Sequence, residues 1–210
     1  MSRQQETMTR RPIAARSSAW AIALSARLAR WGVTPNSISV LSVLFAAIGA
    51  WLIGAVDHWL GWLVAAACVQ LRLVCNLLDG MVAIEGGRKS KVGAIYNEFP
   101  DRIADTLFLV PLGYAADVPW LGWAAALLAA LTAYVRVFGG ALGQAQDFSG
   151  IMAKQRRMAA LTIGLVGQAI ASLVPAGHWP LTVTAAIIAV GSLVTCVTRT
   201  VAIAQALERS

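Results

Sequence analysis

Six long apolar segments divide this chain, and they restrict its fold more than any other feature. They cover Ser37–Val56, Trp59–Leu78, Asn97–Ala116, Trp120–Gly143, Met158–Val174 and Leu181–Ala204. Each approaches the roughly 20 residues that a helix needs to cross about 30 Å of hydrocarbon. Only 13% of the residues are charged, against about 25% in an ordinary soluble domain. The sequence therefore predicts an all-α, polytopic membrane protein with six transmembrane helices.

The positions of the basic residues predict how these helices are oriented. Six of the 17 Lys and Arg residues precede the first segment, and three lie in each of the connections before the third and fifth segments. The connections near Asp57, Asp117 and His178 contain none. The positive-inside rule then places both termini in the cytoplasm. We expect an integral protein of a bacterial inner membrane, with its site on the cytoplasmic side. The basic face would lie beside anionic headgroups, so the net charge of +7 does not indicate nucleic acid binding.

Residues 1–35 are expected to form a cytoplasmic segment in front of the six-helix domain, residues 36–210. A helix is predicted from Arg16, and four large apolar residues share one of its stripes: Trp20, Leu24, Leu28 and Trp31. This pattern is typical of an amphipathic helix that lies in the membrane interface. A signal peptide is the alternative, but the apolar core Ala19–Ala26 is barely as long as such a peptide needs.

Polar residues interrupt the apolar pattern where the second segment ends and the third begins. One helical stripe in the second segment contains Arg72, Asn76, Asp79, Gly80 and Ala83. In the third segment, Asn97, Asp101 and Asp105 recur at intervals of four, and so drift only ~40° per step around a helix. Ionisable side chains at membrane depth are costly and indicate a functional site. Carboxylate and amide oxygens are the ligands that Mg²⁺ prefers.

A purely structural interpretation is open for part of this run. Buried polar side chains can join helices in a membrane, and Arg102 has the spacing to pair with Glu98 and with Asp105 along one helix. For Asp79 and Asp101 we favour the functional interpretation, because joining two helices does not need small residues beside the acids.

The same run resembles the signature of the CDP-alcohol phosphatidyltransferases, Asp-x2-Asp-Gly-x2-Ala-Arg-x8-Gly-x3-Asp-x3-Asp. Its eight fixed positions are occupied here, with every gap of the right length, by Asn76, Asp79, Gly80, Ala83, Ile84, Gly93, Asn97 and Asp101. Five of the eight residues match, whereas Asn76 and Asn97 replace aspartates and Ile84 replaces the arginine. The six segments and the basic stretch before the fifth extend the resemblance over nearly the whole chain.

The resemblance implies an enzyme of phospholipid synthesis. Such an enzyme transfers a phosphatidyl group from a CDP-linked lipid, usually CDP-diacylglycerol, to a small alcohol or alcohol phosphate, and it releases CMP. It also implies a homodimer, a divalent cation (Mg²⁺ or Mn²⁺) on Asp79, and Asp101 as the catalytic base. The nucleotide site would be lined by Asn76, Gly80, Ala83 and Gly93.

The two asparagines remove two units of negative charge from that metal site. We therefore predict that Asp79, Asp101 and Asp105 jointly supply its anionic oxygens, and that Asn76 and Asn97 serve as neutral ligands or nucleotide contacts. The site would hold one or two ions, and either Asp101 or Asp105 would be the base. The alternative for Asp105 is an ion pair with Arg102.

Three basic residues are candidates for binding a phosphate of the acceptor or of the lipid: Arg136, Lys154 and Arg157. Ordinary positive-inside topology is the alternative for Lys154 and Arg157. Arg136 has no obvious local partner and lies close to a predicted span, which favours a function.

Two other functions stay open. A catalytically impaired homologue could bind a nucleotide lipid without turnover, since two motif aspartates are replaced. A cation-coupled transporter could use the polar run as an ion path, but it would need acids spread across the membrane, whereas here they gather toward the cytoplasmic ends.

Overall fold

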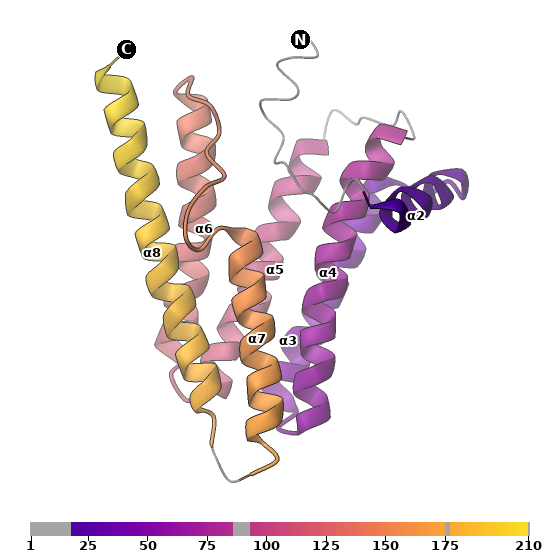
Figure 1. The fold of residues 1–210 in the computed structure, drawn as a ribbon, viewed down its shortest axis with the longest axis vertical. Helices are drawn as coiled ribbons and strands as arrows, with labels where there is room; N and C mark the ends of the chain where they lie inside the picture. The colour runs from indigo at the N-terminus through magenta and orange to yellow at the C-terminus, as the bar shows by residue number, and fades with distance from the viewer. Residues whose placement is uncertain (1–17, 86–92, 175–176, 210) are drawn as a thin grey trace.

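The computed structural model describes residues 18–85, 93–174 and 177–209, and within them it is all-helical, without strands (Figure 1). A short helix, α2 (Ala19–Arg30), precedes six long ones. These are α3 (Pro35–Ala55), α4 (Trp59–Glu85), α5 (Gly93–Ala115), α6 (Pro119–Ala141), α7 (Lys154–Ala171) and α8 (Trp179–Glu208). The six long helices coincide with the six apolar segments, so the all-α prediction is confirmed.

The long helices pack side by side around a common core. Helix α3 contacts α4 and α5, α6 contacts α5 and α8, and α7 lies between α4 and α8. The long helices thus form a closed ring, and α5 and α8 also contact each other across it. The core inside that ring is filled by buried apolar side chains that include Trp62, Phe108, Leu112, Leu161, Leu165 and Leu181.

Small residues bring some of these helices into close contact. A Cβ atom built on Gly113 of α5 would lie 2.6 Å from the Cα atom of Gly122 in α6, and one built on Gly164 of α7 would lie 2.0 Å from the hydroxyl of Thr184 in α8. Real atoms do not approach so closely, so these glycines set the spacing between neighbouring helices, as small residues do in membrane bundles.

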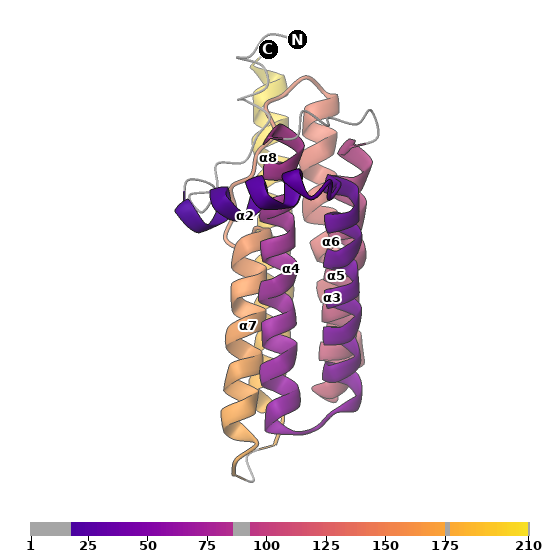
Figure 2. The ribbon, with the colours of Figure 1, turned by 90° about the vertical axis from the view of Figure 1, so that its right-hand side faces the viewer.

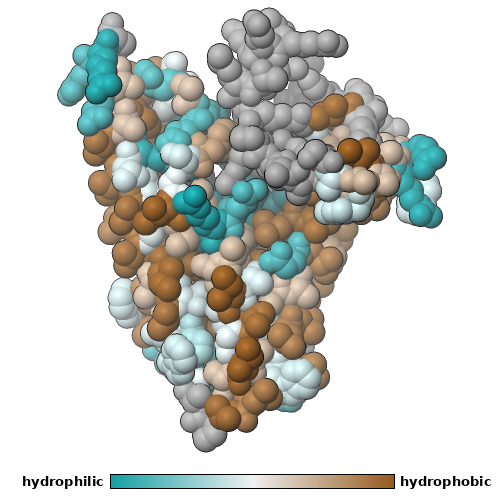
Figure 3. Space-filling model, in the orientation of Figure 1, coloured by the Kyte–Doolittle hydropathy of each residue, from teal (hydrophilic) through white to brown (hydrophobic). Residues whose placement is uncertain are grey.

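The surface of the bundle is apolar along its flank. Figure 3 shows many hydrophobic residues along the visible flank. Large exposed apolar side chains of the bundle include Trp51, Trp120 and Ile163. Four helices, α3, α4, α6 and α8, are long and apolar enough to cross a bilayer. The chain is therefore an integral membrane protein. Helices α5 and α7 are more polar than the other four, and their crossing of the membrane stays a prediction.

Helix α2 lies crosswise to the long helices (Figure 2). Its Leu24 and Leu28 pack on a small apolar cluster of α3 and α4 that includes Ile38 and Leu78, whereas Trp20 and Trp31 are exposed. A helix is therefore present in this segment with one face on the bundle, and its place in the membrane interface stays a prediction. Its predicted start, Arg16, lies outside the described residues.

Residues 142–153 connect α6 to α7 and fold back along the bundle, so that α7 begins well below the end of α6 (Figure 1). Arg199 of α8 holds this connection, because its Nη2 atom donates to the carbonyl of Ser149 over 2.5 Å. The amide of Met152 donates to the hydroxyl of Thr195 over 3.0 Å. These contacts place Lys154, the first residue of α7, beside α4 and α5.

Candidate active site

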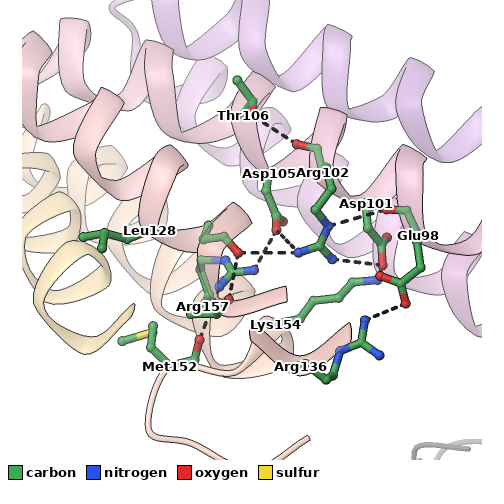
Figure 4. A network of polar contacts seen from close by, with 12 residues as sticks. Glu98, Asp101, Arg102, Asp105, Thr106, Leu128, Arg136, Met152, Lys154 and Arg157 are labelled. Atoms are coloured by element: carbon green, nitrogen blue, oxygen red, sulfur yellow. Dashed lines mark hydrogen bonds and ion pairs between the residues drawn. The ribbon is translucent and has the colours of Figure 1, made fainter. Parts of the chain in front are cut away.

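Asp101 of α5 is the centre of a polar network at the end of the bundle where α4 ends and α5 begins (Figure 4). Its Oδ1 atom accepts from Arg72 Nη2 at 3.1 Å and from Asn76 Nδ2 at 3.0 Å. Its Oδ2 atom accepts from Lys154 Nζ. The spacing of four residues places Arg72 and Asn76 on one face of α4, so both reach the same carboxylate.

Asp105 lies one turn deeper and is almost completely buried. Arg157 Nη2 of α7 lies 2.6 Å from its Oδ2 atom, and Arg72 Nη2 lies 3.4 Å from its Oδ1 atom. Arg102 is a third and more distant partner at 3.9 Å. Both oxygens of Asp105 therefore face arginines, which favours the ion-pair interpretation of this residue. Its predicted part in metal binding and proton transfer stays untested.

Of the two pairs that the spacing of Arg102 allows, the one with Asp105 is present at 3.9 Å, whereas the Glu98 carboxylate has a different partner. Arg102 Nε donates to the backbone oxygen of Glu98 at 3.5 Å, and its Nη1 atom donates to the carbonyl of Ala129 at 3.5 Å. The Glu98 carboxylate instead lies 2.6 Å from Arg136 Nη2 of α6. A partner from a neighbouring helix replaces the local one because α5 and α6 are packed together at this level.

Arg136, which has no local partner in the sequence, is thus paired in the structure. Besides Glu98, its Nη1 atom donates to Gln146 Oε1 over 2.5 Å. Its guanidinium lies over the ring of Phe148, with 4.9 Å to the centroid.

Asp147 lies in the connection between α6 and α7. Burial alone would raise its pKa, but hydrogen bonds from Ser149 hold that pKa below its ordinary value.

Asp79 lies on the same stripe of α4 as Arg72 and Asn76 and is buried. Its Oδ2 atom accepts a hydrogen bond from Ser39 of α3 at 2.9 Å. It is close enough to Asp101 and Lys154 to interact with both electrostatically. The structure therefore brings Asp79, Asn76 and Asp101 to one place, together with the cations that surround Asp101.

The small residues of the signature lie nearby in the sequence. Gly80 and Ala83 are half-buried near the end of α4. Gly93 begins α5, and a Cβ atom built on it would meet nothing within 4 Å. The side chain of Asn97 lies outside what the structure describes, so its predicted role stays a prediction.

The oxygen donors at this site are those that a hard cation prefers, but they are few. Asp79, Asp101 and Asn76 provide them, and the described residues contain no group of three or more His, Cys, Asp or Glu side chains arranged for a metal. Mg²⁺ is commonly held by one or two carboxylates together with substrate phosphates and water. The described donors fit part of the coordination of such an ion, which substrate phosphates and water would complete, and the number of ions stays a prediction.

Sequence reasoning missed several members of this site. Ser39 carries no signal except its place at the start of the first apolar segment. The pairing of Arg72 with Asp101 joins residues 29 positions apart, and that of Lys154 with Asp101 joins residues 53 positions apart. Arg199 carries no sequence signal beyond its charge, yet it is buried and bonded to the connection before α7.

Curated relatives share much of this sequence, although no family profile matches the chain. It is 31% identical over 180 residues to the phosphatidylinositol phosphate synthase of Mycobacterium tuberculosis H37Rv, covering 82% of this chain and 80% of that protein. It is 33% identical over 152 residues to the bifunctional IPC transferase and DIPP synthase of Rubrobacter xylanophilus. That match covers 69% of this chain, which spans about a third (34%) of the length of that relative.

The fold is also shared with solved structures of the Mycobacterium tuberculosis phosphatidylinositol phosphate synthase. The crystal structure with CDP-DAG bound superposes with a TM-score of 0.72 at 22% identity, covering 89% of this chain and 94% of that one. The complex of that enzyme with manganese and citrate gives 0.71 at 21% identity, with coverage of 87% and 88%.

This ring of six helices, with acids and cations gathered at one end, is an integral membrane bundle of the kind that those solved structures share. Because a relative at 31% identity matches over most of both chains, the chain belongs to the CDP-alcohol phosphatidyltransferase family.

Proposed function

We propose that this protein transfers a phosphatidyl group from a CDP-linked lipid, such as CDP-diacylglycerol, to a small alcohol or alcohol phosphate, with release of CMP. The observation that carries the proposal is the convergence of α4, α5 and α7 on Asp101. There a carboxylate meets Asn76 from one helix and Lys154 from another, and the buried carboxylate of Asp79 is near enough for the charges of Asp101 and Lys154 to act on it.

The balance of charge at this site supports an anionic substrate. Three carboxylates, Asp79, Asp101 and Asp105, lie among four cations, Arg72, Arg102, Lys154 and Arg157, so the cations exceed the acids by one. An excess of buried positive charge is costly unless an anion compensates it. The diphosphate of a CDP-linked lipid would supply that charge where the acids already lie.

In this proposal Asp79, Asn76 and Asp101 would hold a divalent cation, Mg²⁺ or Mn²⁺. When bound, such an ion neutralises phosphate charge during attack. Asp101 is also the candidate to accept the proton of the acceptor hydroxyl, for which it must come within hydrogen-bond reach of that group. Asn97 and Asp105 remain predicted contributors to the same site.

Basic residues around the acids would bind the phosphates. Lys154 and Arg157 lie at the start of α7, and Arg136 reaches the same end of the bundle from α6 (Figure 4). Arginine can bind phosphate with two parallel hydrogen bonds. Gly93 has open space where a Cβ atom would stand, and Gly80 and Ala83 carry almost no side chain, which supports their predicted place in a nucleotide site.

The proposed topology follows from charge and burial. Helices α5 and α7 would cross the bilayer along with the four apolar helices, since their ionisable residues Asp101, Asp105 and Arg157 are buried in the bundle. Helix α2 would lie in the interface, and Arg27 stacks over the ring of Trp31 at its end, with 4.6 Å to the centroid. Both termini and the site would face the cytoplasm of a bacterial inner membrane. A homodimer is expected from the family resemblance alone.

The direct test is to incubate the purified protein with CDP-diacylglycerol, Mg²⁺ or Mn²⁺, and a panel of alcohols and alcohol phosphates. We expect CMP release that requires both the divalent cation and one acceptor. The lipid product, identified by mass spectrometry, would name the acceptor. No CMP release with any acceptor, at any concentration of either metal, would contradict the proposal.

One observation favours a second candidate, a homologue that binds the nucleotide lipid without turnover. Asn76 stands where the family has an aspartate, and its amide donates to Asp101 instead of adding a negative charge. Binding of CDP-diacylglycerol without CMP release would identify this case.

A further inference from the structure

We propose that Lys154 is an exchangeable internal cation of this site. Lys154 neutralises Asp101 in the arrangement seen here, and it moves to the phosphates of a bound nucleotide when Asp101 binds a divalent cation. This inference rests on the proposed function, because it assigns that site a nucleotide and a metal. It predicts that the two ligands bind cooperatively, each depending on the movement of one side chain.

The contacts of Asp101 show which of its two oxygens can exchange partners. Oδ1 is held by Arg72 and Asn76, both from α4. Oδ2 accepts from Lys154, and Arg102 is 3.8 Å away. A divalent cation would take Oδ2 as a ligand, and the ammonium group on the same oxygen would repel that cation. Metal binding through Oδ2 would therefore favour the departure of Lys154.

Arg72 and Lys154 differ in their freedom to move. The side chain of Arg72 is completely buried and is paired with both Asp101 and Asp105. The side chain of Lys154 is 20% exposed, and lysine carries a compact charge on a flexible four-carbon stem. Arg72 is therefore a fixed partner of the acids, whereas Lys154 can swing away from them.

The electrostatic surroundings of Lys154 favour its transfer to a phosphate. Asp101 and Asp105 attract the ammonium, while Arg72 repels it. Once a divalent cation neutralises Asp101, the repulsion by Arg72 is no longer offset, and a nucleotide phosphate offers new anionic oxygens. By thermodynamic reciprocity, the nucleotide must raise the affinity for the cation by the same factor as the cation raises the affinity for the nucleotide.

The test measures Mn²⁺ binding, by the electron paramagnetic resonance signal of free Mn²⁺, on the full chain in detergent with and without CMP. For the unmodified protein, we expect CMP to tighten Mn²⁺ binding by roughly fivefold or more. For Lys154→Met, we expect Mn²⁺ binding without CMP to be about tenfold tighter and the effect of CMP to fall below about twofold. Lys154→Arg keeps a cation at this position and should retain the dependence on CMP.

Arg156→Met is the matched control, because Arg156 is exposed and donates to the carbonyl of Gly150. It should leave both Mn²⁺ affinities unchanged. Equal or weaker Mn²⁺ binding by a folded Lys154→Met protein would overturn the inference, and so would a lack of Mn²⁺ binding by every variant with CMP present. CMP release from CDP-diacylglycerol together with either result would leave the proposed function intact. If CMP tightens Mn²⁺ binding as expected but no CMP is ever released from CDP-diacylglycerol, the proposed function would be contradicted and the inference about Lys154 would stand.

Discussion

The two ends of the helix bundle both contain aspartates and basic side chains, but they use them differently. At one end, Asp105 is buried and Arg157 lies 2.6 Å from its carboxylate. At the other end, the connections α3–α4, α5–α6 and α7–α8 bring Asp57 and Asp117 to His178, at 3.3 and 3.9 Å. There the side chains of Asp57 and Asp117 are 65% and 91% exposed.

The difference shows how burial changes the worth of the same chemical groups. At the exposed end, a hollow of about 230 Å³ lies beside His178. Water there screens the charges of the two aspartates. At the buried end, charges interact strongly and each must find a partner. We therefore expect the catalytic chemistry at the buried end. At the exposed end, we expect the contacts of His178 with Asp57 and Asp117 only to hold three connections together.

The largest predicted contrast is in stability. Asp105→Ala should lower the free energy of unfolding by about 3–5 kcal/mol, because it leaves Arg157 and Arg72 buried without their carboxylate. Asp117→Ala should cost only about 1–2 kcal/mol, because its ion pair is exposed and the loss comes mainly from its left-handed backbone (φ 58°), which Ala tolerates less well than Asp. Equilibrium unfolding in mixed micelles, followed by circular dichroism, measures both changes.

A double variant sharpens this contrast. Asp105→Leu combined with Arg157→Met removes a carboxylate together with its closest arginine, so it should be more stable than Asp105→Ala alone. Equal losses for Asp105→Ala and Asp117→Ala would show that the buried network does not hold the bundle together.

A smaller effect is predicted for substrate affinity. Arg136→Met should raise the KM for a phosphate-bearing substrate by about 10–100-fold, since hydrogen bonds to charged groups contribute about 1.5–3 kcal/mol. The measurement is the KM for each substrate in the CMP-release assay. Arg156→Met serves as the control on α7 and should leave both values unchanged. Unaltered KM values in Arg136→Met would show that Arg136 binds no substrate phosphate and serves only as the ion-pair partner of Glu98.

The smallest effect is predicted at the exposed end. His178→Gln should change the free energy of unfolding by less than about 1 kcal/mol, because its carboxylate partners are largely in water. CMP release should stay at the level of the unmodified protein. A large loss of CMP release in this variant would break the comparison, since it would show that the two ends are coupled.

The helices could be predicted from the sequence because each has its own apolar run, but their ends could not. Helix α4 continues to Glu85, beyond the predicted Leu78, and α7 begins at Lys154, before the predicted Met158. Hydrophobicity reports only the part of a helix that suits lipid. Polar residues extend these helices where neighbouring helices supply their partners.

The candidate site could be predicted in composition but not in pairing. The spacing of Asp79 and Asp101 identified both acids, and charge identified Lys154 and Arg157. The contacts among them join different helices, and no local pattern encodes which arginine reaches which aspartate. The preference of Glu98 for Arg136 over Arg102 is an example, since it depends on how α5 packs against α6.

The most direct test of where the chemistry occurs compares one aspartate from each end. CMP release from CDP-diacylglycerol is measured for Asp79→Ala and for Asp57→Ala, with folding of both checked by circular dichroism. We predict that Asp79→Ala loses about 100-fold or more, corresponding to roughly 2.7 kcal/mol of transition-state stabilisation, and that Asp57→Ala retains its activity. Full activity in a folded Asp79→Ala protein would contradict the assignment of the active site to the buried end.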